Sequence, residues 1–252
     1  MNIFVTNTLS SNQYHEAMEL TELCSKADGT HGISFLEQEL NEIEEFPCFY
    51  MMYDGNRLVS YLSVFIPDDD QCEIYGGTLP EERGKGYFKR LLKEALINIR
   101  KYGIERKMVV IEPGCRDMEE YLTKINAKLV DTDYLMSYDK NVKPAPKRVL
   151  TMTHEKNDST EHYETFKDSV SVGSCNVEFT RTQAVIYNLM VEENQRGKGY
   201  GTETLLLILE HILNSGVSRI LLHVNDANKV AHAMYSHHGF VHEEQIDYWL
   251  LP

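Results

Sequence analysis

A glycine-rich segment occurs twice in this chain, and the repeat limits what the chain can fold into. Residues 83–88 read Arg-Gly-Lys-Gly-Tyr-Phe, and residues 196–201 read Arg-Gly-Lys-Gly-Tyr-Gly. In both places a β-like apolar run precedes the glycines, and apolar residues at helical spacing follow them. The repeat therefore predicts two related units, each a strand, a glycine turn and a helix.

Each glycine turn is expected to bind an anion such as a pyrophosphate. Glycines let the backbone approach a ligand closely, and the free amides at a helix start point toward it with the positive end of the helix dipole. Arg83 and Lys85, and likewise Arg196 and Lys198, add positive charge. Neither copy is a P-loop, which needs Ser or Thr after Gly-Lys, and neither has the Rossmann glycine spacing.

The second copy resembles motif A of the GNAT superfamily of acyl-CoA-dependent N-acyltransferases, whose signature is Gln/Arg-x-x-Gly-x-Gly/Ala. Arg196, Gly199 and Gly201 fill its three positions. Further along the chain, the motif B pattern of the same family is matched at Asn228, Ala231, Tyr235, Gly239 and Phe240. Asp226 is expected to cap the helix of motif B and Gly239 to end it.

The first copy keeps the outline of these motifs and loses detail. It matches motif A at Arg83 and Gly86, but Phe88 stands where Gly or Ala is expected, and we expect it to crowd the turn and re-aim it. Gly114 replaces the motif B Asn, and Tyr121 lies close to the position of Tyr235. We interpret the first half as an eroded copy that can hold CoA but is less suited to chemistry.

The resemblance implies an α/β protein with a tandem GNAT fold, each half a mixed, mostly antiparallel sheet flanked by helices. We place the domains at residues 1–142 and 143–252, because two prolines and a change of charge fall within residues 140–148. Further elements are expected as helices at 12–25 and 33–45, a hairpin around 54–56, and strands at 161–168 and 171–180. The second half has no helix pair like the one that lines the acceptor side in GNAT enzymes. The first half or a second protomer is expected to supply that wall.

The function that the resemblance implies is transfer of an acetyl group from acetyl-CoA to a primary amine of a small molecule, directly in a ternary complex, by the second half. The residues expected to bind acetyl-CoA are Leu189, Met190, Val191, Arg196, Gly197, Lys198, Gly199, Tyr200, Gly201 and Asn228. The amide of Leu189 or Met190 is expected to polarise the thioester carbonyl. No metal is expected.

Tyr235 is the expected general acid for the CoA thiolate. Glu178 and Glu192 are the expected bases, with Glu193 and His223 as other options. Glu192 and Glu193 are equally consistent with a solvated loop near a helix start, where negative charge is favourable. Two alternatives for the whole chain stay open. One is a non-catalytic module that binds CoA for regulation; the other is an acyltransferase that acts on a protein N-terminus or uses a longer acyl-CoA.

Composition restricts the partners. The net charge of −14 argues against nucleic-acid binding, which needs a basic surface. Five scattered cysteines without a Cys-x-x-Cys pair, no apolar run near the ~20 residues that span a bilayer, and no secretory leader lead us to expect a cytoplasmic protein without a membrane partner. His237 and His238 are adjacent, so their side chains diverge on a helix and fit a helix end better than a metal site.

Overall fold

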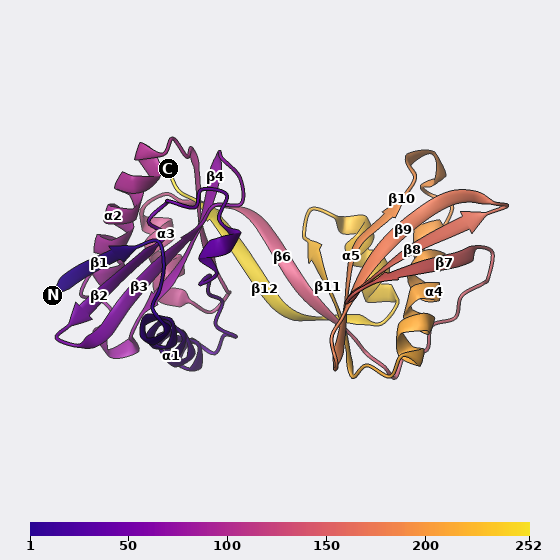
Figure 1. Cartoon of the computed structure of the whole chain (residues 1–252), viewed down its shortest axis with the longest axis horizontal. Helices are drawn as coiled ribbons and strands as arrows, with labels where there is room; N and C mark the ends of the chain where they lie inside the picture. Colours follow the sequence, from indigo (N-terminus) through magenta and orange to yellow (C-terminus); the bar gives the residue numbers. More distant parts are fainter. The chain divides into compact units, whose positions relative to one another are not determined.

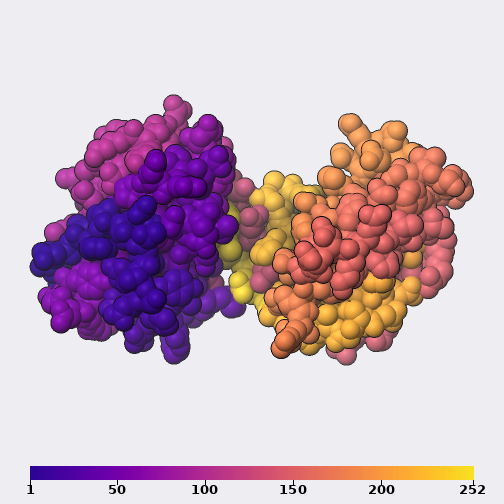
Figure 2. All heavy atoms as spheres, in the orientation of Figure 1, coloured from indigo at the N-terminus to yellow at the C-terminus, as the bar shows by residue number.

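The computed structural model describes residues 1–252 and divides into two compact units. Unit 1 comprises Met1–Thr132 and Ile246–Pro252, and unit 2 comprises Asp133–Gln245. Figure 2 shows each unit as a closely packed body, and each has its own buried apolar core.

Unit 1 is a mixed, mostly antiparallel sheet with helices against it (Figure 1). Its sheet has the strand order β1-β2-β3-β4-β5-β12, and β4 and β5 are its parallel pair. The strands are β1 (Asn2–Thr6), β2 (Phe49–Asp54), β3 (Arg57–Phe65), β4 (Gln71–Thr78), β5 (Arg106–Ile111) and the end of β12 (Phe240–Leu250), and the helices are α1 (Ser11–Asp28), α2 (Tyr87–Lys101) and α3 (Arg116–Lys124).

Unit 2 repeats this plan with the strand order β6-β11-β10-β9-β8-β7, in which β10 and β11 are the parallel pair. The strands are the end of β6 (Lys128–Tyr138), β7 (Thr151–Asn157), β8 (Thr160–Lys167), β9 (Val170–Phe179), β10 (Gln183–Val191) and β11 (Arg219–Asn225), and the helices are α4 (Tyr200–Asn214) and α5 (Lys229–His237). The fold predicted from sequence is confirmed, as are the two strands expected at 161–168 and 171–180.

Helices α1 and α2 cover opposite faces of the unit 1 sheet. Seven consecutive residues of β3, from Leu58 to Val64, are buried, so neither face of this strand meets solvent. The hydroxyl of Tyr61 lies 2.6 Å from that of Thr21 on α1. On the other face Asn98 of α2 donates to the hydroxyl of Tyr50, which is the residue opposite Leu62. The sheet is therefore covered by a helix on each face next to β4, the strand that leads into the first glycine turn.

The predicted boundary at 142/143 differs from the division into units, because the two halves exchange their last strands. The end of β6 pairs with β11 in unit 2, from Asp133 opposite Asn225 to Ser137 opposite Leu221. The end of β12 pairs with β5 in unit 1. The segment after β6 also belongs to unit 2, since the buried carboxylate of Glu203 on α4 accepts hydrogen bonds from the backbone of residues 147 and 149.

Of the two helices expected before β2, one forms and the other does not. The first is α1, which begins with a capping box between Ser10 and Gln13 and ends at Gly29 in the left-handed region. The helix predicted at 33–45 is wrong: only a short 3₁₀ turn, Gln38–Leu40, forms there. The segment is irregular because it forms hydrogen bonds to distant parts of the chain. Glu112 accepts backbone N–H groups at its start, and Asn41 accepts the N–H of Ile66.

The hairpin expected around residues 54–56 is confirmed. It joins β2 to β3, with Asp54 opposite Arg57, and Gly55 takes a φ of +60° in the turn. A side chain at this φ would be strained, so the glycine suits the turn.

The exchange makes a prediction about fragments. A fragment of residues 133–245 retains every strand of unit 2 and is expected to unfold cooperatively in urea. A fragment of residues 143–252 lacks β6, so it loses the fully buried Met136 and leaves β11 as an open edge. We expect no cooperative transition from it by circular dichroism. A transition of the same midpoint and slope in both fragments would contradict the exchange.

Candidate active site

In each unit the parallel strand pair separates just before the glycine turn. Strand β10 pairs with β11 from Gln183 to Ile186 and then runs on to Val191 without it. In the same way β4 pairs with β5 from Gln71 to Ile74 and runs on to Thr78. Backbone groups on the open side of the leading strand are thus free of ladder partners, and an extended ligand can use them.

The two glycine turns have the same backbone geometry. Gly84 and Gly197 both have φ of +76°, and Gly86 and Gly199 have φ of +79° and +81°. Gly86 and Gly199 are the N-caps of α2 and α4, and neither helix has a side-chain cap. The prediction that Phe88 re-aims the first turn is therefore wrong. Phe88 instead packs against the core and lines a cavity.

The motif arginines hold the turns in place. Nε of Arg196 donates to the carbonyl of Val191 at 3.1 Å, and Nε of Arg83 donates to the carbonyl of Thr78 at 3.2 Å. Each bond ties the turn to the end of its own leading strand. The arginine thus has a structural role that the motif alone does not reveal, since a sequence pattern suggests only a charge near a phosphate.

The cations of the two turns differ in their partners. Nη1 and Nη2 of Arg83 form a bidentate ion pair with Asp28 at 2.6 and 2.8 Å, and Lys85 pairs with Glu82 at 2.7 Å. This pairing holds the pKa of Arg83 above its usual range. In unit 2 Arg196 makes no ion pair, and Lys198 donates only to a neutral amide. The second turn therefore keeps its positive charge for an anion.

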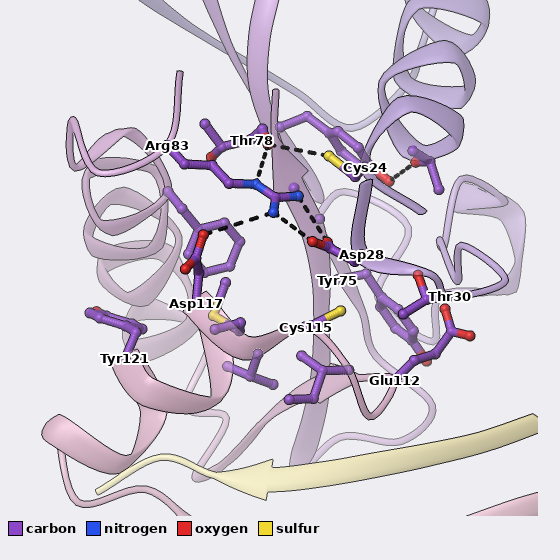
Figure 3. Close-up of a pocket in the computed structure, with 18 of the residues that line it drawn as sticks. Cys24, Asp28, Thr30, Tyr75, Thr78, Arg83, Glu112, Cys115, Asp117 and Tyr121 are labelled. Atoms are coloured by element: carbon purple, nitrogen blue, oxygen red, sulfur yellow. Dashed lines mark hydrogen bonds and ion pairs between the residues drawn. The ribbon is translucent and has the colours of Figure 1, made fainter. Parts of the chain in front are cut away.

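Unit 1 contains a cavity of about 650 Å³ beside its glycine turn (Figure 3). Its wall is formed by α1, by β4 and β5 where they diverge, by the start of α2 and by α3. A volume of this size suits a small molecule or the end of a cofactor. Its charged lining residues are the acids Asp28, Glu82, Glu112, Asp117 and Glu120 and the bases Arg83, Lys89 and Lys124.

The carboxylate of Glu112 fixes one side of this cavity. It is 4% exposed and accepts the backbone N–H groups of His31 and Gly32 at 2.8 Å and of Ile33 at 3.2 Å. These bonds tie the segment between α1 and β2 to the end of β5. Sequence reasoning missed Glu112; the only available signal was an acid that directly follows a buried strand, and its amide partners lie about 80 residues earlier in the chain.

The predicted cofactor residues of β10 lie at an irregularity in that strand. The pairing of β10 with β9 shifts register between Tyr187 and Met190, and Asn188 has a φ of +51°. Such a bulge re-aims backbone groups next to a site. Leu189 packs against the core while the side chain of Met190 is 61% exposed. Gly201 follows the turn, and a Cβ there would lie 3.3 Å from Cγ2 of Val191, so a larger residue would require that side chain to shift slightly.

The two tyrosines at matching positions differ in burial. Tyr235 is 7% exposed, and burial raises its pKa to about 12. Tyr121 is half-buried on the cavity wall, and burial raises its pKa as well. Because a free thiol has a pKa of ~8.5, a phenol with a pKa near 12 keeps its proton beside a thiolate. Such a phenol is suited to donate a hydrogen bond rather than a proton.

The structure does not bring the other predicted catalytic residues together. Glu178 lies opposite Val185, before the bulge, and is exposed. Glu192 and Glu193 are exposed at the 3₁₀ turn after β10. His223 is exposed on β11.

A polar residue of motif B caps the start of α5. Asn228 is the N-cap of α5, its side chain accepting the N–H of Ala231 at 3.2 Å. The prediction that Asp226 caps this helix is therefore wrong; Asp226 pairs with Lys229 instead. The helix ends before Gly239, which has a φ of +94°, as predicted.

The chain matches the Acetyltransferase (GNAT) family over residues 14–119 and again over 129–240. It belongs to this family. The two matches correspond to the two strand–turn–helix units, so the protein is a tandem GNAT. A search of curated protein sequences found no match.

Solved structures with the same fold include other GNAT proteins. A GCN5-related N-acetyltransferase from Sphaerobacter thermophilus has a TM-score of 0.80 and 14% identity, over 99% of this chain and 96% of that one. A tandem GNAT protein from the clavulanic acid biosynthesis pathway has a TM-score of 0.70 and 15% identity, over 99% and 98%. At these identities the likeness concerns the fold. None of this chain's helices combines the length and apolar character that crossing a membrane requires.

The burial of Tyr235 leads to a prediction for acyl transfer. On the expectation that Tyr235 assists departure of the CoA thiolate, Tyr235→Phe removes the hydrogen-bond donor and should lower turnover about tenfold with little change in acetyl-CoA affinity. Because a phenol with a pKa of about 12 stays protonated below that pH, wild type and variant should share the same rate profile between pH 7 and 9. Tyr121→Phe is the matched control. Turnover equal to wild type in Tyr235→Phe would remove this residue from the mechanism.

Proposed function

We propose that this tandem GNAT transfers an acetyl group from acetyl-CoA to a primary amine of a small molecule, and that unit 2 performs the transfer. The amine nitrogen attacks the thioester carbonyl carbon in a ternary complex. The carbon–sulfur bond breaks, the nitrogen loses a proton, and the CoA thiolate leaves. In this proposal Leu189, Met190 and Val191 hold the pantetheine arm, and the turn from Arg196 to Tyr200 binds the pyrophosphate.

The observation that carries the proposal is the charge of the second glycine turn. Both turns offer the same backbone amides, so charge decides which one a pyrophosphate prefers. The cations of the first turn are neutralised by Asp28 and Glu82, whereas Arg196 and Lys198 have no acidic partner. Two further features of unit 2 support the same assignment. One is the bulge of β10, and the other is Gly201, which stands at the position that Phe88 occupies in unit 1.

Exposed acids beside the second turn support an amine acceptor. Glu192 and Glu193 stand at the end of the leading strand, where a carboxylate can attract a cationic amine and take its proton through water. We retain Glu192, with Glu178 as the alternative, as the proposed base.

Five free cysteines support a cytoplasmic location for the protein.

A second candidate is supported by the cavity of unit 1. That cavity has an acceptor-side wall from α1, a tyrosine on α3 and more acids than bases, which suits a cationic amine. In this case unit 1 is the catalytic unit. Unit 2 then either binds acetyl-CoA without turnover or has only a structural role.

Calorimetric titration of acetyl-CoA separates the candidates. Gly199→Glu places an anion in the second turn, and Gly86→Glu does so in the first. We expect Gly199→Glu to abolish binding of acetyl-CoA and its use with a panel of primary amines. We expect Gly86→Glu to retain both.

The chain provides matched controls for backbone strain. Gly103 and Gly216 have φ of +79° and +83°, close to those of Gly86 and Gly199, and also have open space around a Cβ. Gly103→Glu and Gly216→Glu should therefore cost the same strain without touching either turn, and should bind as wild type does. Loss of binding and turnover only in Gly86→Glu would favour unit 1. Binding without turnover on any amine would favour a regulatory module.

A further inference from the structure

Three potential metal ligands converge in unit 2, away from the glycine turn. They are His154 on β7, Glu161 on β8 and His211 on α4, and their ligand atoms all lie within 4.8 Å of one another. Nε2 of His211 is 3.4 Å from Oε2 of Glu161, and the rings of His154 and His211 have centroids 4.6 Å apart. No other group of three such residues is found in the chain.

The register of the β7–β8 hairpin explains the cluster. His154 lies opposite Tyr163, and Lys156 lies opposite Glu161, so these four side chains share one face of the sheet. The last turn of α4 brings His211 against that face. The negative end of the helix dipole lies there and favours a cation. His162, between Glu161 and Tyr163, points to the other face, where it contacts Asn176.

The donor set suits zinc. Two imidazoles and one carboxylate, with a solvent molecule as fourth ligand, form a common tetrahedral zinc site. Bonds of about 2 Å place ligand atoms ~3.3 Å apart in that geometry, so His211 and Glu161 need no movement. His154 has to approach, and it is an exposed side chain on the edge strand β7. Tyr163 donates a hydrogen bond to Glu161 at 2.5 Å and orients the carboxylate.

One cation competes with a metal at this place. Nζ of Lys156 is 3.9 Å from Oε1 of Glu161, whose side chain is only 11% exposed. Without a metal, the ammonium group of Lys156 offsets part of the charge of this carboxylate. The Lys156 side chain is 66% exposed, so it can swing into solvent when a divalent ion binds.

We propose that His154, Glu161 and His211 bind one Zn²⁺ ion that ties the edge strand β7 to the C-terminal end of α4. His211 lies eleven residues after the start of α4, roughly 16 Å along the helix from the glycine turn. The zinc site is therefore separate from the proposed acetyl-CoA site and does not rest on it. No metal was expected from the sequence, because the three ligands come from elements that are separate in the chain.

The test uses the tag-free full-length protein after treatment with a chelator, with ZnCl₂ titrated in a calorimeter. Wild type is expected to bind one Zn²⁺ with a dissociation constant below ~1 μM and to show a higher melting temperature with the ion. His211→Gln and His154→Gln should each weaken binding by about 100-fold or more. Lys156→Gln should tighten binding, because it removes the competing cation. A circular dichroism spectrum of each metal-free variant checks its folding.

Two controls locate the ion. His162→Gln changes a residue that lies on β8 next to Glu161 but points to the opposite face of the sheet. His242→Gln removes one member of the His232–His242 pair elsewhere in unit 2. Both should bind zinc as wild type does. The proposal is overturned if wild type shows no one-to-one binding below ~10 μM, if His211→Gln binds like wild type, or if His242→Gln alone abolishes binding.

Discussion

The point at which two parallel strands stop pairing governs the chemistry available to each unit. Four residue pairs hold β4 to β5 and β10 to β11, and beyond them the leading strand has one free edge. That edge leads directly into a glycine turn whose amides are not capped by a side chain. A ligand with an amide-bearing arm and a pyrophosphate matches this sequence of backbone groups. The helices and the remaining strands serve to hold the edge in place.

The two units show how charge can differ on one backbone. Their turns agree in φ to within a few degrees, yet the first has its arginine and lysine neutralised by Asp28 and Glu82 and the second does not. Unit 1 also has the helix α1, the segment bonded to Glu112 and a cavity of about 650 Å³. Unit 2 has the charge and the strand bulge. This contrast is the physical basis for proposing different roles for two copies of one fold.

The glycine repeat was sufficient to predict both turns and the strand and helix beside each, because these features depend on local spacing and on residues close in sequence. The fold as a whole was predicted from the resemblance of the motifs to those of the GNAT family. The exchange of β6 and β12 was not predictable, since either strand could satisfy its hydrogen bonds in either unit. The helix expected at 33–45 did not form because its residues bond to distant parts of the chain: the N–H of Ile33 donates to Glu112, and the side chain of Asn41 accepts the N–H of Ile66. The motif gave the position of Arg196 and Asn228, but their bonds to Val191 and Ala231 needed the structure.

A crystal structure with acetyl-CoA bound would show which unit holds the cofactor and through which groups. We expect pyrophosphate oxygens on the backbone amides between Gly197 and Gly201, and the pantetheine arm along Leu189 to Val191 beside β11. Acetyl-CoA in the corresponding place in unit 1 would keep the role of the diverging strands and reverse the assignment of the units. Acetyl-CoA bound without contact to either glycine turn would contradict the account.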